Sequence, residues 1–210
     1  LEREHGGLFR GMLAKRKSGV GPGGVLMSFH GGVSRFIDHL VGQIDADWQL
    51  AADISAVEYT GDGYRLQGAE GEAWEADQVV VATPAFAAAR ILSGLDAALV
   101  EDLREIDYSP VAVVGLGYRQ PVAALDGFGL LTTTAAQQPV LGVLWDSSIF
   151  ADRAPPGAQS LRVLIGGQRQ PELAAQDDAG LVATALQGVR QTMGVTATPD
   201  VTFVRTWRHG

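Results

Sequence analysis

The residues GVGPGG at positions 19–24 match the pattern G-x-G-x-x-G, which in other proteins can hold the pyrophosphate of a dinucleotide. Such a turn works when a buried strand precedes it and a helix follows, because the free N–H groups at the helix start then face the phosphates. Here the charged segment Lys15–Ser18 precedes the glycines and the apolar run 25–30 follows them. Pro22 also removes one of the backbone donors that the turn would need. We therefore interpret 19–24 as a linker.

Other side chains that could do chemistry are few. The chain has no cysteine, which excludes thiolate nucleophiles and cysteine-ligated metals, and its four histidines are not paired at the spacing of a metal site. No G-x-S-x-G motif marks a serine nucleophile. Asp38 lies on an expected helix, and Asp146 ends an apolar run, where we expect its carboxylate to bond the turn at Ser147 and Ser148. Hydrolytic chemistry is not supported.

Composition excludes further classes. The chain has 210 residues, of which 46% are hydrophobic, and its mean hydropathy is +0.09, so a sizeable core is expected. A net charge of −8 disfavours a nucleic-acid partner. No apolar stretch approaches the length of about 20 residues that a membrane span needs, and no signal peptide opens the chain, so a cytoplasmic location is expected. Because the chain starts with Leu1 and stops after a strand-like run, we expect a piece of a longer protein.

The first half of the chain has the pattern of an α/β region. The apolar run 25–30 predicts a strand, and an apolar stripe through 31–44 with helical spacing predicts a helix. The runs 54–60 and 64–68, separated by Gly-Asp-Gly, predict a hairpin. The valine-rich run 78–83 predicts a strand buried on both faces of a parallel sheet, followed by a helix that begins at a proline.

The second half changes character near residue 108. A helix is predicted over about 177–193, and the apolar runs that predict strands are 111–118, 127–133, 140–147, 161–167 and 201–207. Strands that follow one another without intervening helices indicate an antiparallel sheet. These runs are apolar at nearly every position. Either helices cover both faces of the sheet, or one face lines an apolar pocket for a flat ligand.

Several segments resemble the protoporphyrinogen oxidases, a family of FAD-dependent enzymes within the monoamine oxidase and phytoene desaturase superfamily. The most specific are LGVLWDSSIFADRAP at 141–155 and IGGQRQPEL at 165–173, whereas ADQVVVATP at 76–84 is typical of the whole superfamily. The others lie at 31–40, 108–114, 127–131 and 205–210. The resemblance covers nearly the whole chain.

The resemblance implies α/β plus α+β architecture, in which part of a doubly wound FAD-binding domain is joined to an antiparallel-sheet substrate domain. It assigns 1–24 to the end of a helical domain and a linker, 25–107 to a partial FAD-binding domain, 108–205 to the substrate domain and 206–210 to the return into the FAD domain. In the family the true G-x-G-x-x-G turn lies upstream of this region. The chain would then be a central fragment that is inactive alone.

The resemblance also implies function. The full protein would oxidise protoporphyrinogen IX to protoporphyrin IX in haem biosynthesis, with FAD as cofactor and O2 as acceptor. Cofactor contacts are expected from Ile54 and Trp207, and substrate contacts from Phe128, Leu131, Leu144 and Leu164. No catalytic acid or base and no metal ligand is expected, and the family's arginine for a substrate propionate would lie outside this sequence.

Alternatives stay open at this point. They are oxidation of coproporphyrinogen III, another amine-oxidase-type flavoprotein such as a carotenoid desaturase, and a non-catalytic tetrapyrrole-binding protein. A homodimer, and a peripheral contact with the inner face of a membrane through the helical domain, are also open.

Overall fold

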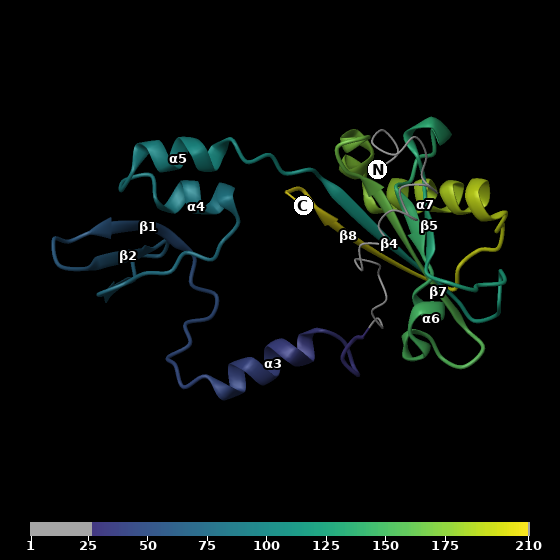
Figure 1. Ribbon diagram of the computed structural model, residues 1–210, viewed down its shortest axis with the longest axis horizontal. Helices are drawn as coiled ribbons and strands as arrows, with labels where there is room; N and C mark the ends of the chain where they lie inside the picture. Colours follow the sequence, from purple (N-terminus) through teal and green to yellow (C-terminus); the bar gives the residue numbers. More distant parts are fainter. Residues whose placement is uncertain (1–26, 210) are drawn as a thin grey trace, which may run out of the picture. The chain divides into compact units, whose positions relative to one another are not determined.

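The computed structural model describes residues 27–209 and divides the chain into two compact units, 1–48 and 49–210 (Figure 1). The linker at 19–24, and the whole segment 1–24 expected as the end of a helical domain, lie outside the described residues. In the first unit the expected helix is present as α3 (Ser34–Gln43). The expected strand at 25–30 is wrong for its described residues, 27–30. Phe29 instead precedes a glycine turn and stacks on Phe36 of α3, with ring centroids 5.4 Å apart.

The second unit begins with a three-stranded antiparallel sheet in the order β1-β2-β3. Strands β1 (Ile54–Tyr59) and β2 (Tyr64–Gly68) form the predicted hairpin, and β3 (Ala73–Ala76) was not predicted. The turn between β1 and β2 contains Gly61 at φ 106°, a left-handed conformation that glycine adopts without strain.

The valine-rich run 78–83 is not a strand, and Val80 in its middle is 91% exposed. A parallel strand needs neighbours on which to form its backbone hydrogen bonds, and both described sheets are antiparallel. The helix after it is present as α4 (Ala85–Ile91), with Pro84 as its N-cap, and α5 (Ala97–Arg104) follows. Helix α4 packs against both β1 and α5.

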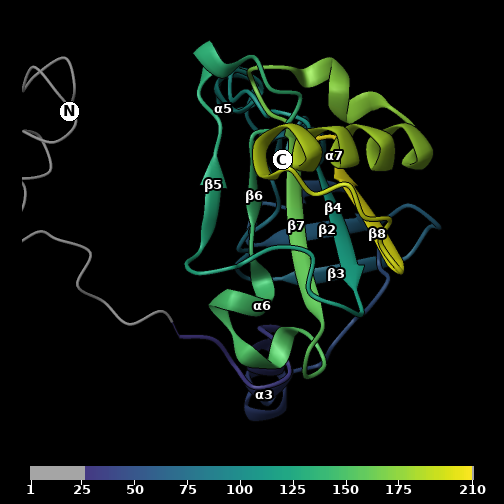
Figure 2. The same cartoon turned by 90° about the vertical axis from the view of Figure 1, so that its right-hand side faces the viewer.

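A five-stranded sheet follows, in the order β5-β6-β7-β4-β8 (Figure 2). Every pair of neighbouring strands is antiparallel, as the sequence predicts. The strands are β4 (Val111–Tyr118), β5 (Gly129–Leu131), β6 (Gly142–Leu144), β7 (Gln159–Gly166) and β8 (Val201–Trp207). Strand β6 is shorter than predicted because Asp146 already begins a short helix, α6 (Asp146–Ile149). The mixed α/β fold class with an antiparallel-sheet domain is confirmed.

The core lies between this sheet and α7 (Asp178–Met193). Alternate residues of β4 are fully buried beneath the helix, from Ala112 to Tyr118, as expected for a strand with one covered face. Asp177 caps the start of the helix, where its carboxylate accepts a hydrogen bond from the N–H of Gly180, and Gly194 caps its end. Gly188 lets it approach closely, since a Cβ there would lie 2.3 Å from Val140 Cγ1.

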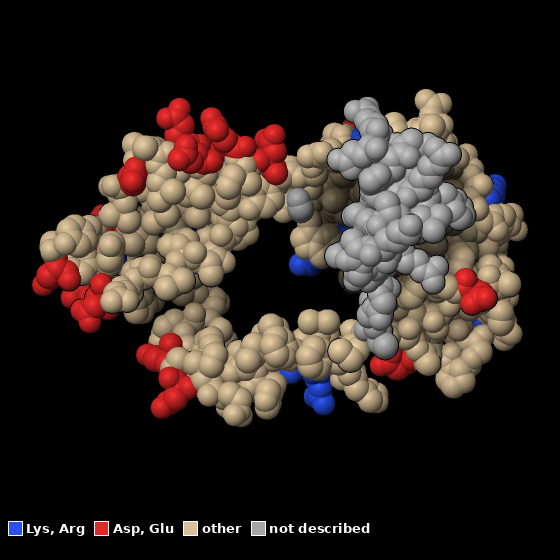
Figure 3. Space-filling model, in the orientation of Figure 1, with Lys and Arg blue, Asp and Glu red and all other residues tan. Residues whose placement is uncertain are grey.

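The remaining connections are short. The 3-10 turns η1 (Thr134–Ala136) and η2 (Ala151–Arg153) lie between strands of this sheet, and η3 (Pro171–Ala175) lies between β7 and α7. Within residues 27–209, no helix is both long and apolar enough to cross a membrane. Acidic side chains gather over α5 and the residues just after it (Figure 3), including Glu101, Asp102 and Glu105.

Candidate ligand-binding face of the five-stranded sheet

The face of the five-stranded sheet opposite α7 carries large exposed apolar side chains. The strand register places Leu131, Gly142, Leu164, Val113 and Arg205 in one cross-strand row. The neighbouring row on one side contains Gly129, Leu144, Arg162, Gly115 and Phe203, and on the other side of the first row Trp207 pairs with Val111. Leu131 is 81% exposed, Phe203 61% and Trp207 45%. We call this set of residues the open face.

The structure brings most of the expected ligand residues together here. Leu131, Leu144 and Leu164 share the open face, and Trp207 lies on it at the end of β8. Phe128 directly precedes β5 and is 61% exposed. Ile54 is not part of this group, because it begins β1 in the other sheet, where it is half-buried. The roles of these six residues stay predictions.

Glycines keep parts of the open face flat. The Cβ and Cδ1 of Phe203 lie over Gly115, 3.5 and 3.9 Å from where a Cβ of that glycine would stand. A Cβ on Gly142 would lie 2.8 Å from Leu131 Cδ2 and 2.5 Å from the backbone oxygen of Leu130. A side chain at position 142 would therefore collide with Leu130 and Leu131, whereas at position 115 Phe203 already lies at contact distance above the glycine. The result is a surface of leucine and aromatic groups over a glycine floor, suited to a flat apolar ligand.

The open face carries two arginines with different surroundings. Arg162 is bound by Asp146, with Nε donating to Oδ2 at 3.0 Å and Nη2 donating to Oδ1. The Asp146 carboxylate is thus engaged across the sheet and does not bond the turn at Ser147 and Ser148, so that expectation is wrong. A bidentate pair with a guanidinium is stronger than a hydrogen bond to a turn hydroxyl. Arg205 has no hydrogen bond or ion pair with any residue between 27 and 209.

A cluster of aromatic rings that was not predicted joins residues that lie in, or directly after, three of the resembling segments. The Phe86 ring lies 5.2 Å from the Tyr108 ring and 4.4 Å from the His209 ring. The Tyr108 hydroxyl accepts a hydrogen bond of 2.9 Å from the backbone N–H of Ala85. The cluster ties the start of α4 to the residues that precede β4 and follow β8. Only the family resemblance pointed to these segments, because their contacts are long-range.

Arg169 was also missed, although it lies in the segment IGGQRQPEL. Its guanidinium donates to the Thr132 backbone oxygen at 2.9 Å, to Thr132 Oγ1 at 2.7 Å and to the Val140 backbone oxygen at 3.1 Å. These bonds close the loop between β5 and β6. Arg169 therefore fixes the residue that follows Leu131 and supports one end of the open face.

Cavities elsewhere have a different character. One of about 360 Å³ lies beside the β1–β2 hairpin and is lined by charged side chains that include Asp62, Arg65 and Glu75. Another of about 330 Å³ lies between α4 and α5 beside Phe86 and Leu103. Neither involves the open face.

Comparison with known proteins decides the family. The family model described as flavin containing amine oxidoreductase matches residues 1–210. The chain belongs to this family. Its members are flavin-containing oxidoreductases, which confirms the expected enzyme class and FAD as the expected cofactor.

Individual relatives agree with the resemblance found in the sequence. The chain is 32% identical over 185 residues to a coproporphyrinogen III oxidase of Propionibacterium freudenreichii subsp. freudenreichii, covering 86% of this chain and 34% of the relative. It is 27% identical over 194 residues to a chloroplastic protoporphyrinogen oxidase of Nicotiana tabacum, covering 86% and 35%. The chain thus spans about a third of the length of these relatives.

A solved structure shares the fold. A protein of Exiguobacterium sp. 255-15, assigned as a protoporphyrinogen oxidase, superposes with a TM-score of 0.79 at 21% sequence identity. The match covers 98% of this chain and 44% of the other. The relatives and the shared fold together confirm that the chain is related to the porphyrinogen oxidases and corresponds to part of such a protein.

The described residues fit one part of a flavin and not another. The open face offers apolar and aromatic surface to a flat ring. A pyrophosphate needs free N–H groups at a helix start, yet Asp96 accepts from Ala98 and Leu99 at the start of α5, and Asp177 accepts from Gly180 at the start of α7. A carboxylate at each of these sites would repel a phosphate. Residues 27–209 can thus contribute to holding the ring system, while these two helices cannot hold the phosphates.

Proposed function

We propose that this chain is part of a flavin-dependent porphyrinogen oxidase and that its five-stranded sheet holds the porphyrinogen on the open face. The substrate in this proposal is protoporphyrinogen IX, the product is protoporphyrin IX and the electron acceptor is O2. One observation carries it. Leu131, Leu144, Leu164 and Trp207, which the family resemblance picks out from separate strands, share a single face with a glycine floor.

In this reaction the sheet would need only to orient the substrate. When bound, FAD would supply the hydride acceptor for oxidation of the macrocycle. The leucines and aromatic groups of the open face would hold the macrocycle flat and keep water from it. Asp146, the carboxylate that meets this face, is held by Arg162 and is not free to act as a base. An arrangement that positions a reactive carbon without an acid or base suits a reaction in which the cofactor takes the electrons.

Two contacts with the flavin belong to the same proposal. Trp207 would pack beside the ring system, next to the substrate leucines. The backbone at Ile54 would contact the adenine. This contact is possible because β1 is an edge strand of its sheet. The corresponding division assigns 25–107 and 206–210 to the flavin-binding part and 108–205 to the substrate part.

Coproporphyrinogen III is a second candidate substrate. Its support is specific, because the bacterial relative at 32% identity is a coproporphyrinogen III oxidase. The two substrates differ chemically at the ring edge, where coproporphyrinogen carries propionates in place of vinyl groups.

Turnover by the full-length protein tests the proposal. The purified protein would be assayed for bound flavin by its absorption spectrum, and for oxidation of each porphyrinogen by the fluorescence of the porphyrin formed. We expect a flavin spectrum and porphyrin formation that requires O2. A flavin-free protein, or one that oxidises neither porphyrinogen above the rate of spontaneous oxidation, would contradict the proposal. The ratio of kcat/KM for the two porphyrinogens then decides between the substrates.

A further inference from the structure

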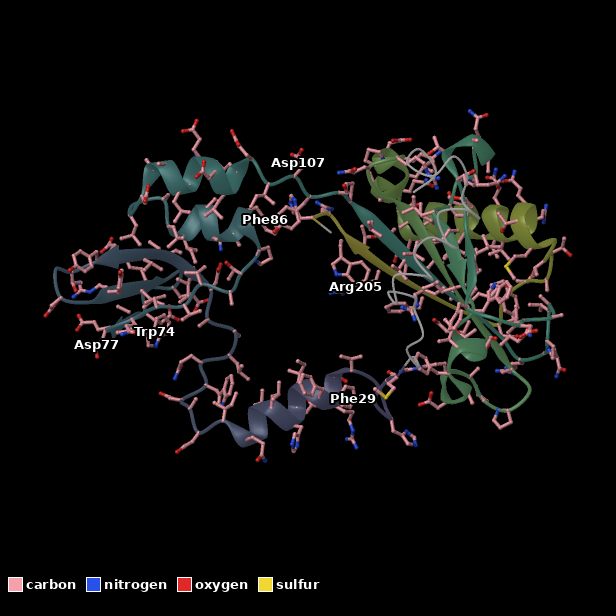
Figure 4. The ribbon with its side chains drawn as sticks, viewed as in Figure 1. Phe29, Trp74, Asp77, Phe86, Asp107 and Arg205 are labelled. Carbon is pink, nitrogen blue, oxygen red and sulfur yellow. The ribbon has the colours of Figure 1, made fainter. Side chains whose placement is uncertain are left out.

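Arg205 occupies an unusual position on the open face. It lies in the same cross-strand row as Leu164 and Leu131, and its strand, β8, forms one edge of the sheet while Leu131 lies on the opposite edge strand. In Figure 4 its side chain leaves β8 on the side away from α7. Phe203 and Trp207, two residues before and after it, point to the same face because strand side chains alternate.

The charge of Arg205 is not neutralised by the described part of the chain. Arg162, in the next row, is held by both oxygens of Asp146, whereas Arg205 has no hydrogen-bond or ion-pair partner within residues 27–209. The two arginines thus differ in what they can offer to a ligand. Arg162 is already paired, whereas no residue between 27 and 209 occupies the donors of Arg205.

We propose that Arg205 binds a carboxylate at the edge of the ligand whose flat apolar body lies on Leu164 and Leu131. This inference rests on the proposed function and deepens it, because it assigns to this chain an anchor for an acidic side chain of the substrate. The ligand class is a flat macrocycle with ionised carboxylates at its rim. Porphyrinogens belong to this class, since propionate groups extend from their ring edges.

The geometry of the sheet suits such a ligand. Neighbouring strands lie about 4.8 Å apart, so the backbone of Arg205 stands roughly 10 Å from that of Leu164, which is two strands away. A broad ring over Leu164 would therefore reach with its rim toward β8. There a guanidinium offers parallel N–H donors that match a carboxylate.

A local cation offsets the negative charge of this chain. With a net charge of −8 the chain repels an anionic ligand at long range. An exposed arginine stays hydrated when no ligand is bound, so its free charge costs little stability. A ligand that covers the open face would exclude water and strengthen the ion pair, because the attraction grows as the local dielectric constant falls.

Binding of a porphyrin and of its esterified form tests the role of Arg205. The full-length protein would be titrated with protoporphyrin IX and with protoporphyrin IX dimethyl ester, following porphyrin fluorescence. The variants are Arg205→Gln, Arg205→Lys and, as a matched control, Arg190→Gln. Arg190 is also exposed, but it lies on α7, on the other side of the sheet.

We expect Arg205→Gln to weaken binding of the free acid about 10- to 100-fold, the range for loss of a hydrogen bond between charged groups. Binding of the ester should change less than about twofold, and Arg205→Lys should retain part of the affinity for the acid. Arg190→Gln should bind both porphyrins as the wild type does. The melting temperature of each variant reports whether its fold is kept.

Equal loss of acid and ester binding, or no loss of either, would overturn the role of Arg205. If the wild type still converts porphyrinogen to porphyrin in that case, the proposed function stands while this inference fails. If the wild type neither oxidises porphyrinogen nor binds either porphyrin, the proposed function fails and the inference falls with it.

Discussion

Replacing Leu131 by aspartate separates a ligand-contacting role from a structural one. Leu131 is 81% exposed, so the folded chain gains little from its burial, and Leu131→Asp should change the free energy of unfolding by no more than about 0.5 kcal/mol. A macrocycle on the open face would cover the new carboxylate without pairing it. Desolvating an unpaired polar group costs about 1–3 kcal/mol in proteins, and a charged group costs more. A penalty of about 3 kcal/mol corresponds to a fall of roughly 150-fold in kcat/KM.

The matched control is Leu50→Asp, because Leu50 is 84% exposed and lies outside the five-stranded sheet. Denaturant unfolding of both variants measures stability, and porphyrin formation by the full-length enzyme measures kcat/KM. Both variants should unfold like the wild type, and only Leu131→Asp should lose activity. Normal kcat/KM in Leu131→Asp, or equal losses in both variants, would refute the reasoning that places the substrate on the open face.

Three further changes test other parts of the structure. Burial raises the pKa of the Tyr118 phenol, whose hydroxyl has no partner among residues 27–209, so its ionisation does not affect stability below about pH 10 and lowers stability as pH rises through the folded-state pKa. Tyr118→Phe should therefore raise the unfolding free energy by about 1 kcal/mol at neutral pH. It should also remove part of the loss of stability at alkaline pH. Denaturation at neutral and at alkaline pH measures the two effects. Gly188→Ala should lower stability by about 1–3 kcal/mol because its methyl group would collide with Val140. Val140→Ala in the same chain should restore part of the loss. An unchanged midpoint of denaturant unfolding in Gly188→Ala would contradict the close helix–sheet contact. Trp207→Ala should leave the melting temperature of the flavin-free protein nearly unchanged, since Trp207 is 45% exposed, but should reduce the stabilisation by added FAD; the reverse pattern would make Trp207 structural.

Local patterns predicted the elements that bury one face. The apolar run 111–118 and the helical stripe in 177–193 correspond to β4 and α7, which pack against each other. The run 78–83 was wrongly predicted to be a strand. Its valines have the composition of a buried parallel strand, but composition alone does not supply the neighbouring strands that would pair with it.

The candidate site was only partly predictable. The apolar runs were compatible with a sheet covered on both faces and with a sheet that has one apolar ligand face. Only the strand register showed that Leu131, Leu144 and Leu164 share one face. The pairing of Asp146 with Arg162 joins residues 16 positions apart on different elements, which no local pattern indicates. The contacts of Arg169 and of the ring of Tyr108 are of the same long-range kind.

Protection of single cysteines tests most directly whether the open face binds the ligand. The chain contains no cysteine of its own, so Leu131→Cys, Phe203→Cys and the control Leu50→Cys can each be introduced into full-length protein from which any cysteine elsewhere has been removed. The rate of alkylation by a maleimide would be measured with and without protoporphyrin IX. We expect the porphyrin to slow alkylation strongly at positions 131 and 203 and to leave position 50 unchanged. Equal rates with and without bound porphyrin at positions 131 and 203 would contradict the assignment of this face as the binding surface.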